Sequence, residues 1–78
     1  MNKFHVAYIA RIGTTELPLW DGVIDAHDAE DARLLASRAA LFSRDDTGVL
    51  PDGRWFHKRA MEAVADQRYY RIAREDAK

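Results

Sequence analysis

The sequence predicts a small α+β domain in which two helices pack on one face of an antiparallel sheet. Two stretches near the N-terminus and one near the C-terminus alternate with the period of two typical of strands. The chain between them has helical periodicity, so the expected order is β-β-α-α-β. With 78 residues there is room for one hydrophobic core, and we expect a single domain over 1–78 with a charged tail at 75–78.

The first strand is expected from Phe4 to Ile12, where large apolar residues alternate with more polar neighbours. Ala7 and Ile9 place apolar groups on the second face as well, which indicates a central or partly covered strand. The turn-forming residues 13–16 then reverse the chain, because Gly13 is free to take a positive φ.

The second strand is expected from Leu17 to Asp25. Its short connection to the first strand predicts an antiparallel hairpin, because parallel pairing needs a long crossover. Pro18 has no N–H and therefore belongs at the start of the strand or on an edge. The alternation predicts one face made of Leu19, Asp21, Val23 and Asp25, and another made of Trp20, Gly22, Ile24 and Ala26.

The first helix has a well-marked start. Asp28 can cap the first turn, Asp31 resembles the acidic arm of a capping box, and Glu30 adds negative charge at the positive end of the helix dipole. The stripe expected to pack on the sheet consists of Ala29, Ala32, Leu35, Ala36, Ala39 and Phe42. Leu34 and Leu41 fall outside this stripe. They can be contacts for a partner, ordinary surface leucines, or residues buried under the C-terminal segment.

Residues 43–53 have a loop composition, and Pro51-Asp52-Gly53 is a strong turn signal. This turn can close a small hairpin between 49–50 and 54–56, or Asp52 can cap a helix over 54–66. We favour the helix, because one of its faces would hold Phe56, Ala60, Ala63, Val64 and Gln67. A last strand is expected over 68–74, with Tyr70 and Ile72 on one side.

The composition, 47% hydrophobic and 32% charged, is that of an ordinary globular domain. The absence of cysteine excludes disulfide frameworks, thiolate zinc sites and cysteine nucleophiles, and it fits a reducing compartment. No stretch approaches the roughly 18 apolar residues of a membrane span. We therefore expect a cytoplasmic protein that does not bind membranes.

Candidate catalytic residues lack the neighbours that catalysis needs. His5, His27 and His57 show no paired-ligand spacing for a metal, and Ser37 and Ser43 have no glycine-flanked elbow. A chain this short is also expected to struggle to enclose a pocket of several hundred Å³. We therefore expect no enzyme activity, no metal and no cofactor.

Charge is distributed unevenly along the chain. Residues 1–53 hold five basic and nine acidic side chains, a balance of −4, whereas 54–78 hold seven basic and four acidic ones, a balance of +3. The acidic candidates for contact with a partner are Asp21, Asp25, Asp28, Glu30, Asp31, Asp45, Asp46 and Asp52. The basic and aromatic alternative for nucleic acid is Arg54, Trp55, Lys58, Arg59, Tyr69 and Arg71. Against both stands the expectation that Trp55, Phe56 and Tyr70 are needed in the core.

The first half of the chain carries a family resemblance. The segments are Val6-Ala7-Tyr8-Ile9, Gly22-Val23-Ile24-Asp25-Ala26 and Asp31-Ala32-Arg33-Leu34-Leu35-Ala36-Ser37. Together they resemble the strand, strand, helix opening of several small phage-encoded anti-CRISPR proteins. The resemblance implies a stoichiometric inhibitor that occupies a host defence complex in the host cytoplasm, without catalytic residues.

We therefore expect a non-catalytic protein-binding module, monomeric or homodimeric, whose partner is a protein such as a CRISPR effector complex. Its acidic groups would face the basic nucleic-acid-binding surfaces of that complex. The alternative is a small nucleic-acid-binding domain that uses the basic and aromatic C-terminal segment.

Overall fold

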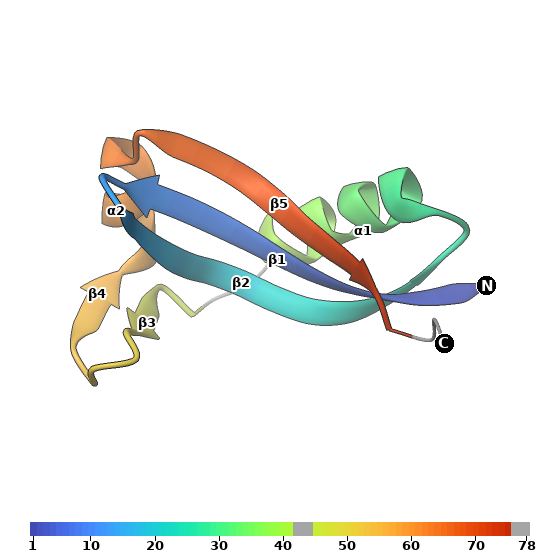
Figure 1. The fold of residues 1–78 in the computed structure, drawn as a ribbon, viewed down its shortest axis with the longest axis horizontal. Coiled ribbons are helices and arrows are strands. Elements are labelled where there is room, and N and C mark those ends of the chain that lie inside the picture. The colour runs from blue at the N-terminus through green and yellow to red at the C-terminus, as the bar shows by residue number, and fades with distance from the viewer. Residues whose placement is uncertain (42–44, 76–78) are drawn as a thin grey trace.

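A computed structural model describes residues 1–41 and 45–75, except for the side chain of Leu41. The elements are β1 (Asn2–Ile12), β2 (Thr15–Ala26), α1 (Ala29–Leu41), β3 (Thr47–Val49), β4 (Trp55–His57), α2 (Lys58–Val64) and β5 (Gln67–Arg74). Strands β2, β1 and β5 form an antiparallel sheet in that order, and β3 and β4 form a separate hairpin (Figure 1). The predicted α+β class is confirmed. The expectations for Phe42, for the Leu41 side chain and for the end of the tail, 76–78, lie outside the described residues.

Strand β1 lies in the centre of the three-stranded sheet, as its two partly apolar faces predicted. It pairs with β2 through the tight turn at 13–14, where Gly13 adopts a φ of +61°. On its other side β1 pairs with β5, from Phe4 opposite Arg74 to Arg11 opposite Gln67. The first and last strands of the chain are therefore neighbours, and they close the domain.

A bulge in β2 changes which residues face the helices. Tyr8 lies opposite Trp20, but the next residue of β1, Ile9, lies opposite Pro18, so Leu19 is an extra residue in the ladder. Leu17, Leu19 and Trp20 all pack against the core as a result. The prediction that Leu19 shares a face with Asp21 is wrong, because a strictly alternating pattern contains no bulge.

Both helices pack on the same face of the sheet, as predicted, and leave the other face without a covering helix (Figure 1). One core cluster joins α1 to the sheet: Ala32 and Ala36 of the helix pack with Phe4 and Val6 of β1. Against α2 lies a second cluster, in which Met61 and Ala65 contact a core that includes Ala10 and Leu17. Ala29 and Ala39 are exposed, so the stripe of α1 that packs on the sheet is narrower than predicted.

The start of α1 is a capping box, as predicted. The amide of Asp31 donates to Oδ1 of Asp28 at 2.8 Å, and the amide of His27 donates to Oδ2 of Asp31 at 3.1 Å. Side chains therefore accept one exposed amide of the first turn, that of Asp31, and the amide of His27 just before the helix.

The helix predicted over 54–66 is shorter, because the hairpin that we considered as its alternative occupies the first part of this segment. Residues 55–57 form β4, and α2 begins only at Lys58. Asp52 does not cap this helix, since its carboxylate accepts the amide of Arg54 within the hairpin turn. The donors of the first turn of α2 are met from elsewhere: the carbonyl of Asp46 accepts the amide of Lys58 at 2.7 Å, and Oδ1 of Asp46 accepts the amide of Arg59 at 3.2 Å.

This shift also changes the buried face of α2. Phe56 reaches the core from a strand, Met61 reaches it from the helix, and Val64 is 61% exposed. The predicted apolar face of Phe56, Ala60, Ala63, Val64 and Gln67 is therefore wrong, because Phe56 precedes the helix and does not share its periodicity.

Phe56 lies over the backbone of Gly48, its partner across the hairpin. A Cβ added at Gly48 would lie less than 3.0 Å from two carbon atoms of the Phe56 ring. Glycine at this position therefore lets the ring of Phe56 approach the hairpin backbone while it packs into the core.

We expect Gly48→Ala to lower the free energy of unfolding by about 1–3 kcal/mol, because the added methyl group forces the buried ring to move. Urea unfolding followed by circular dichroism measures this loss. Val49→Ala is the control, since Val49 is 56% exposed and its truncation should cost much less. Equal costs for the two variants would contradict the contact between Gly48 and Phe56.

Candidate functional site

The outward side of the β3–β4 hairpin is the most exposed apolar feature of the described residues away from the N-terminus. We define the hairpin surface as Thr47, Val49, Trp55 and His57, which alternate with the inward pair Gly48 and Phe56. Trp55 is 75% exposed and lies opposite Val49, which is 56% exposed. Phe56, by contrast, is 7% exposed. The expectation that Trp55 belongs to the core is wrong, because β4 directs neighbouring side chains to opposite sides.

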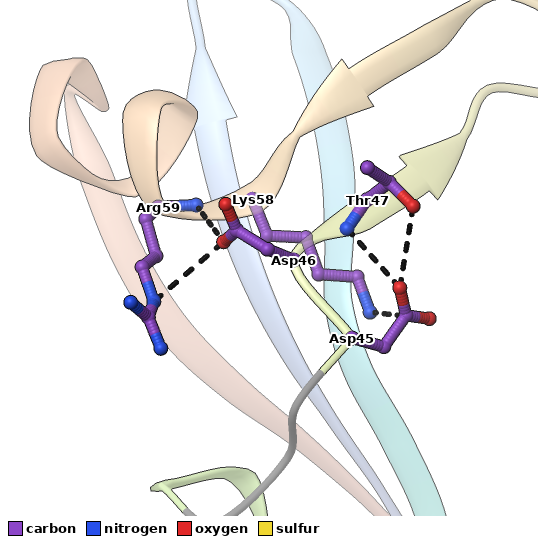
Figure 2. A network of polar contacts seen from close by, with 5 residues as sticks. All are labelled: Asp45, Asp46, Thr47, Lys58 and Arg59. Atoms are coloured by element: carbon purple, nitrogen blue, oxygen red, sulfur yellow. Dashed lines mark hydrogen bonds and ion pairs between the residues drawn. The ribbon is translucent and has the colours of Figure 1, made fainter.

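A network of charges fixes the base of the hairpin to the start of α2 (Figure 2). Oδ1 of Asp45 accepts the amide of Thr47 at 3.1 Å, and Oδ2 of Asp45 lies 3.7 Å from Nζ of Lys58. Oδ1 of Asp46, which accepts the Arg59 amide, also lies 3.6 Å from Nε of Arg59. The hydrogen bond from the Thr47 amide and the charge of Lys58 lower the pKa of Asp45.

The third cation beside the hairpin surface is matched in the same way. Nε of Arg54 donates to Oδ2 of Asp52 at 2.7 Å, and the amide of Arg54 donates to Oδ1 at 3.0 Å. The hydrogen bond from this amide lowers the pKa of Asp52. Each of the three cations near Trp55 therefore has an aspartate partner, and the predicted acidic residues 45, 46 and 52 serve these pairs.

The other two members of the basic and aromatic set, Tyr69 and Arg71, lie on the sheet face opposite the one that α1 and α2 cover. Tyr69 and Arg71 of β5 both donate to Oε2 of Glu16, Arg71 at 2.8 Å, and the Arg71 guanidinium lies 5.9 Å from the centre of the Tyr69 ring. The structure thus divides the six residues between two surfaces. It does not bring them together as one continuous track.

The N-terminal acidic candidates also have separate positions. Asp28 and Asp31 form the capping box of α1, and Glu30 pairs with Arg33 at 2.8 Å. Asp21 and Asp25 lie on the sheet face without helices, where Asp21 lies 3.2 Å from Nε2 of His5. Of the N-terminal acidic candidates, Asp21 and Asp25 are thus the two that lie on the sheet face without helices, which they share with Glu16.

Sequence analysis did not single out Val49 as a contact residue. The Pro51-Asp52-Gly53 turn could have indicated the position of Val49, because a hairpin closed by this turn places residue 49 opposite residue 55. The interpretation of this turn as a helix start removed that pairing.

A cavity of about 380 Å³ lies between α1, the sheet, residues 45–46 and α2. It is lined by Tyr8, Leu19, Trp20, Ser37, Ala40, Asp45, Asp46, Lys58, Arg59, Glu62 and Tyr70. A chain of this length thus forms a recess of several hundred Å³, open to solvent on one side, between α1, the sheet and α2.

Two hydroxyl groups of the cavity wall, those of Tyr8 and Ser37, already have hydrogen-bond partners within the protein. The hydroxyl of Tyr8 donates to Oε2 of Glu62 at 2.5 Å, and the Tyr8 ring stacks on Tyr70 with centroids 4.8 Å apart. Oγ of Ser37 donates to the carbonyl of Leu34 at 2.9 Å, so this hydroxyl is bonded to its own helix. The cavity wall is thus a structural contact between β1, β5 and α2.

Comparison with models of protein families, with curated proteins and with solved structures returned no match. Within residues 1–41 and 45–75, no helix is long and apolar enough to cross a membrane. Across the same part of the chain, no three histidine or acidic side chains are grouped so that they can hold a metal ion.

Burial, followed by the hydrogen bond to Glu62, raises the pKa of Tyr8 from its ordinary value of 10.0 to about 12. The folded state therefore holds this proton more tightly than the unfolded state. The stabilisation is fully present below about pH 10 and is lost as the pH rises to about 12.

We expect the free energy of unfolding to fall over this pH range in the parent protein and to fall less in Tyr8→Phe. Urea unfolding at several pH values measures both declines. Val64→Ala is the control, because it changes an exposed residue and no titrating group. Parallel declines in all three proteins would show that Tyr8 does not contribute to the pH dependence.

Proposed function

We propose that this chain is a non-catalytic protein-binding module that docks through the hairpin surface. The observation that carries the proposal is the exposure of Trp55, which is 75% accessible beside an exposed Val49. The chain has 78 residues and two tryptophans. Because Trp55 lies outside the core, the folded protein does not gain the stability that burial of its large side chain would provide.

Tryptophan is well suited to a contact that forms only on binding. It brings a large area with few rotatable bonds, and it is among the residues that most often dominate the energy of protein interfaces. Val49 extends the apolar area across the hairpin, while Thr47 and His57 add polar groups at its border. An apolar centre with a polar rim is the usual composition of a protein interface.

The charges beside the hairpin surface support a protein partner over a nucleic acid. Nucleic-acid binding by basic side chains depends on cations that replace the counterions of the phosphates. Arg54, Lys58 and Arg59 are each matched to an aspartate. Phosphate contacts at this place would therefore have to compete with ion pairs already formed within the chain.

As the finer proposal, the partner is a nucleic-acid-binding effector complex of a host defence system, and the chain is its phage-encoded inhibitor. Support comes from the resemblance of the first half of the chain to small anti-CRISPR proteins. Asp21 and Asp25, which face solvent from the open side of the sheet, offer negative charge to a basic surface of such a target.

We expect Trp55→Ser to weaken binding to the partner by roughly 2 kcal/mol or more, as for the central residue of an interface. The stability of the variant should change by no more than about 0.5 kcal/mol, because Trp55 is exposed. Pull-down of purified CRISPR effector complexes, together with an assay of interference in cells, measures the effect. Val64→Ser is the control, since it removes an exposed apolar side chain, 61% accessible, from α2.

The outcomes test separately the hairpin surface, the inhibitor and the nucleic-acid alternative. An effector complex that binds Trp55→Ser as well as the parent protein would exclude the hairpin surface. Failure to recover any effector complex, with interference intact, would exclude the inhibitor. A mobility shift of DNA or RNA at low salt that weakens steeply with added salt would favour the nucleic-acid alternative.

A further inference from the structure

We propose that the free edge of β5 binds an extended, acidic segment of a partner protein, which joins the sheet as a fourth strand next to β5. This surface is separate from the hairpin surface. It belongs to the opposite edge of the molecule from the one that the hairpin adjoins (Figure 1).

The backbone of β5 is suited to strand addition. The strand runs without a break in register from Gln67 to Arg74 along β1, and its other side is an edge of the sheet. The amide of Glu75 donates to the carbonyl of Lys3 at 2.8 Å. In an antiparallel pair every second residue bonds to the same neighbouring strand, so this bond shows which residues of β5 bond to β1. Odd-numbered residues therefore face β1, and the backbone groups of Arg68, Tyr70, Ile72 and Arg74 point away from the sheet.

The other edge of the sheet is protected against such pairing. Strand β2 carries Pro18, which has no N–H, and the bulge at Leu19 interrupts its ladder. It also carries three acidic residues, Glu16, Asp21 and Asp25. Proline, bulges and charge are the usual means of keeping an edge strand single. Strand β5 contains neither a proline nor a described bulge.

The side chains of β5 indicate the charge of its partner. The strand contains three arginines and no acidic residue. Arg71 is already paired with Glu16, and Arg74 donates to Oδ1 of Asn2 at 2.7 Å. Nε of Arg68 donates to the neutral carbonyl of Glu62 at 2.8 Å, and within residues 1–41 and 45–75 its guanidinium forms no ion pair. An incoming strand with a carboxylate opposite Arg68 would therefore gain an ion pair across the new ladder.

A second copy of β5 would meet like charges in one of the two antiparallel registers that overlap most through the outward residues. That register would place Arg68 opposite Arg74 at both ends and Arg71 opposite its own copy, whereas the other would place Arg68 opposite Ile72 and Arg71 opposite Tyr69. Like charges directly opposite one another destabilise a strand pair. An acidic strand avoids this repulsion.

The test uses a synthetic peptide of alternating glutamate and valine, equal in length to β5, and a control peptide with lysine in place of glutamate. Amide hydrogen exchange is measured by NMR on the full chain. We expect the glutamate peptide to slow exchange at Arg68, Tyr70 and Ile72 by about tenfold or more at saturation. Amides that already face β1 should change little, and the lysine peptide should have no effect.

Charge variants give a second readout. Arg68→Glu should weaken binding of the glutamate peptide by about tenfold, and Arg38→Glu on α1, which changes the net charge equally, should leave it within about twofold. Trp55→Ser should bind the peptide as the parent protein does. Failure of the peptide experiment therefore leaves the hairpin proposal intact, and failure of the hairpin experiment leaves this one intact.

Three results would overturn the proposal. Equal binding of the lysine peptide would remove the acidic partner. Slowed exchange along β2 in place of β5 would show that the wrong edge was chosen. Slowed exchange at Arg68, Tyr70 and Ile72 that depends on protein concentration and needs no peptide would identify a second copy of the chain as the occupant.

Discussion

The bulge at Leu19 is the constraint on which the two halves of the core depend. It lets Leu17, Leu19 and Trp20 face the helices together, although a regular strand would direct Trp20 to the side opposite Leu17 and Leu19. Trp20 then packs with the cluster under α1, and Leu17 and Leu19 pack with the cluster under α2. Without the bulge, either Trp20 or the pair Leu17 and Leu19 would face the open side of the sheet. One helix would then lose apolar contacts with β2.

The core under α2 is completed from the hairpin by a single aromatic ring. Phe56 enters it over Gly48, and the alternation of β4 then directs Trp55 to the outside. The exposure of Trp55 is thus a consequence of the burial of its neighbour. The aspartates at 45 and 46 hold the hairpin in this position through the start of α2. The surface that we propose for binding is therefore connected to the core through Phe56 and to α2 through these aspartates.

The two edges of the sheet have opposite characters, although they belong to strands on either side of β1. Strand β2 combines acidic side chains, a proline and the bulge, whereas β5 combines arginines with a regular backbone. The packing of the core requires the bulge, and the bulge also protects the edge of β2. Strand β5 lies beside β1 in unbroken register and has no such irregularity. The two features that we connect with binding, the hairpin and the β5 edge, therefore lie on different sides of the three-stranded sheet.

Local patterns in the sequence were sufficient for β1, β2, α1 and β5, since alternation, a tight turn and a capping box act over a few residues. The order of these segments was likewise sufficient for the α+β class. Tertiary structure alone decided the bulge, the start of α2 and the exposure of Trp55. The cap of α2 comes from Asp46, twelve positions before Lys58, and the bulge depends on which residues of β2 the helices cover. Contacts between distant parts of the chain determine these features, and no local period records them.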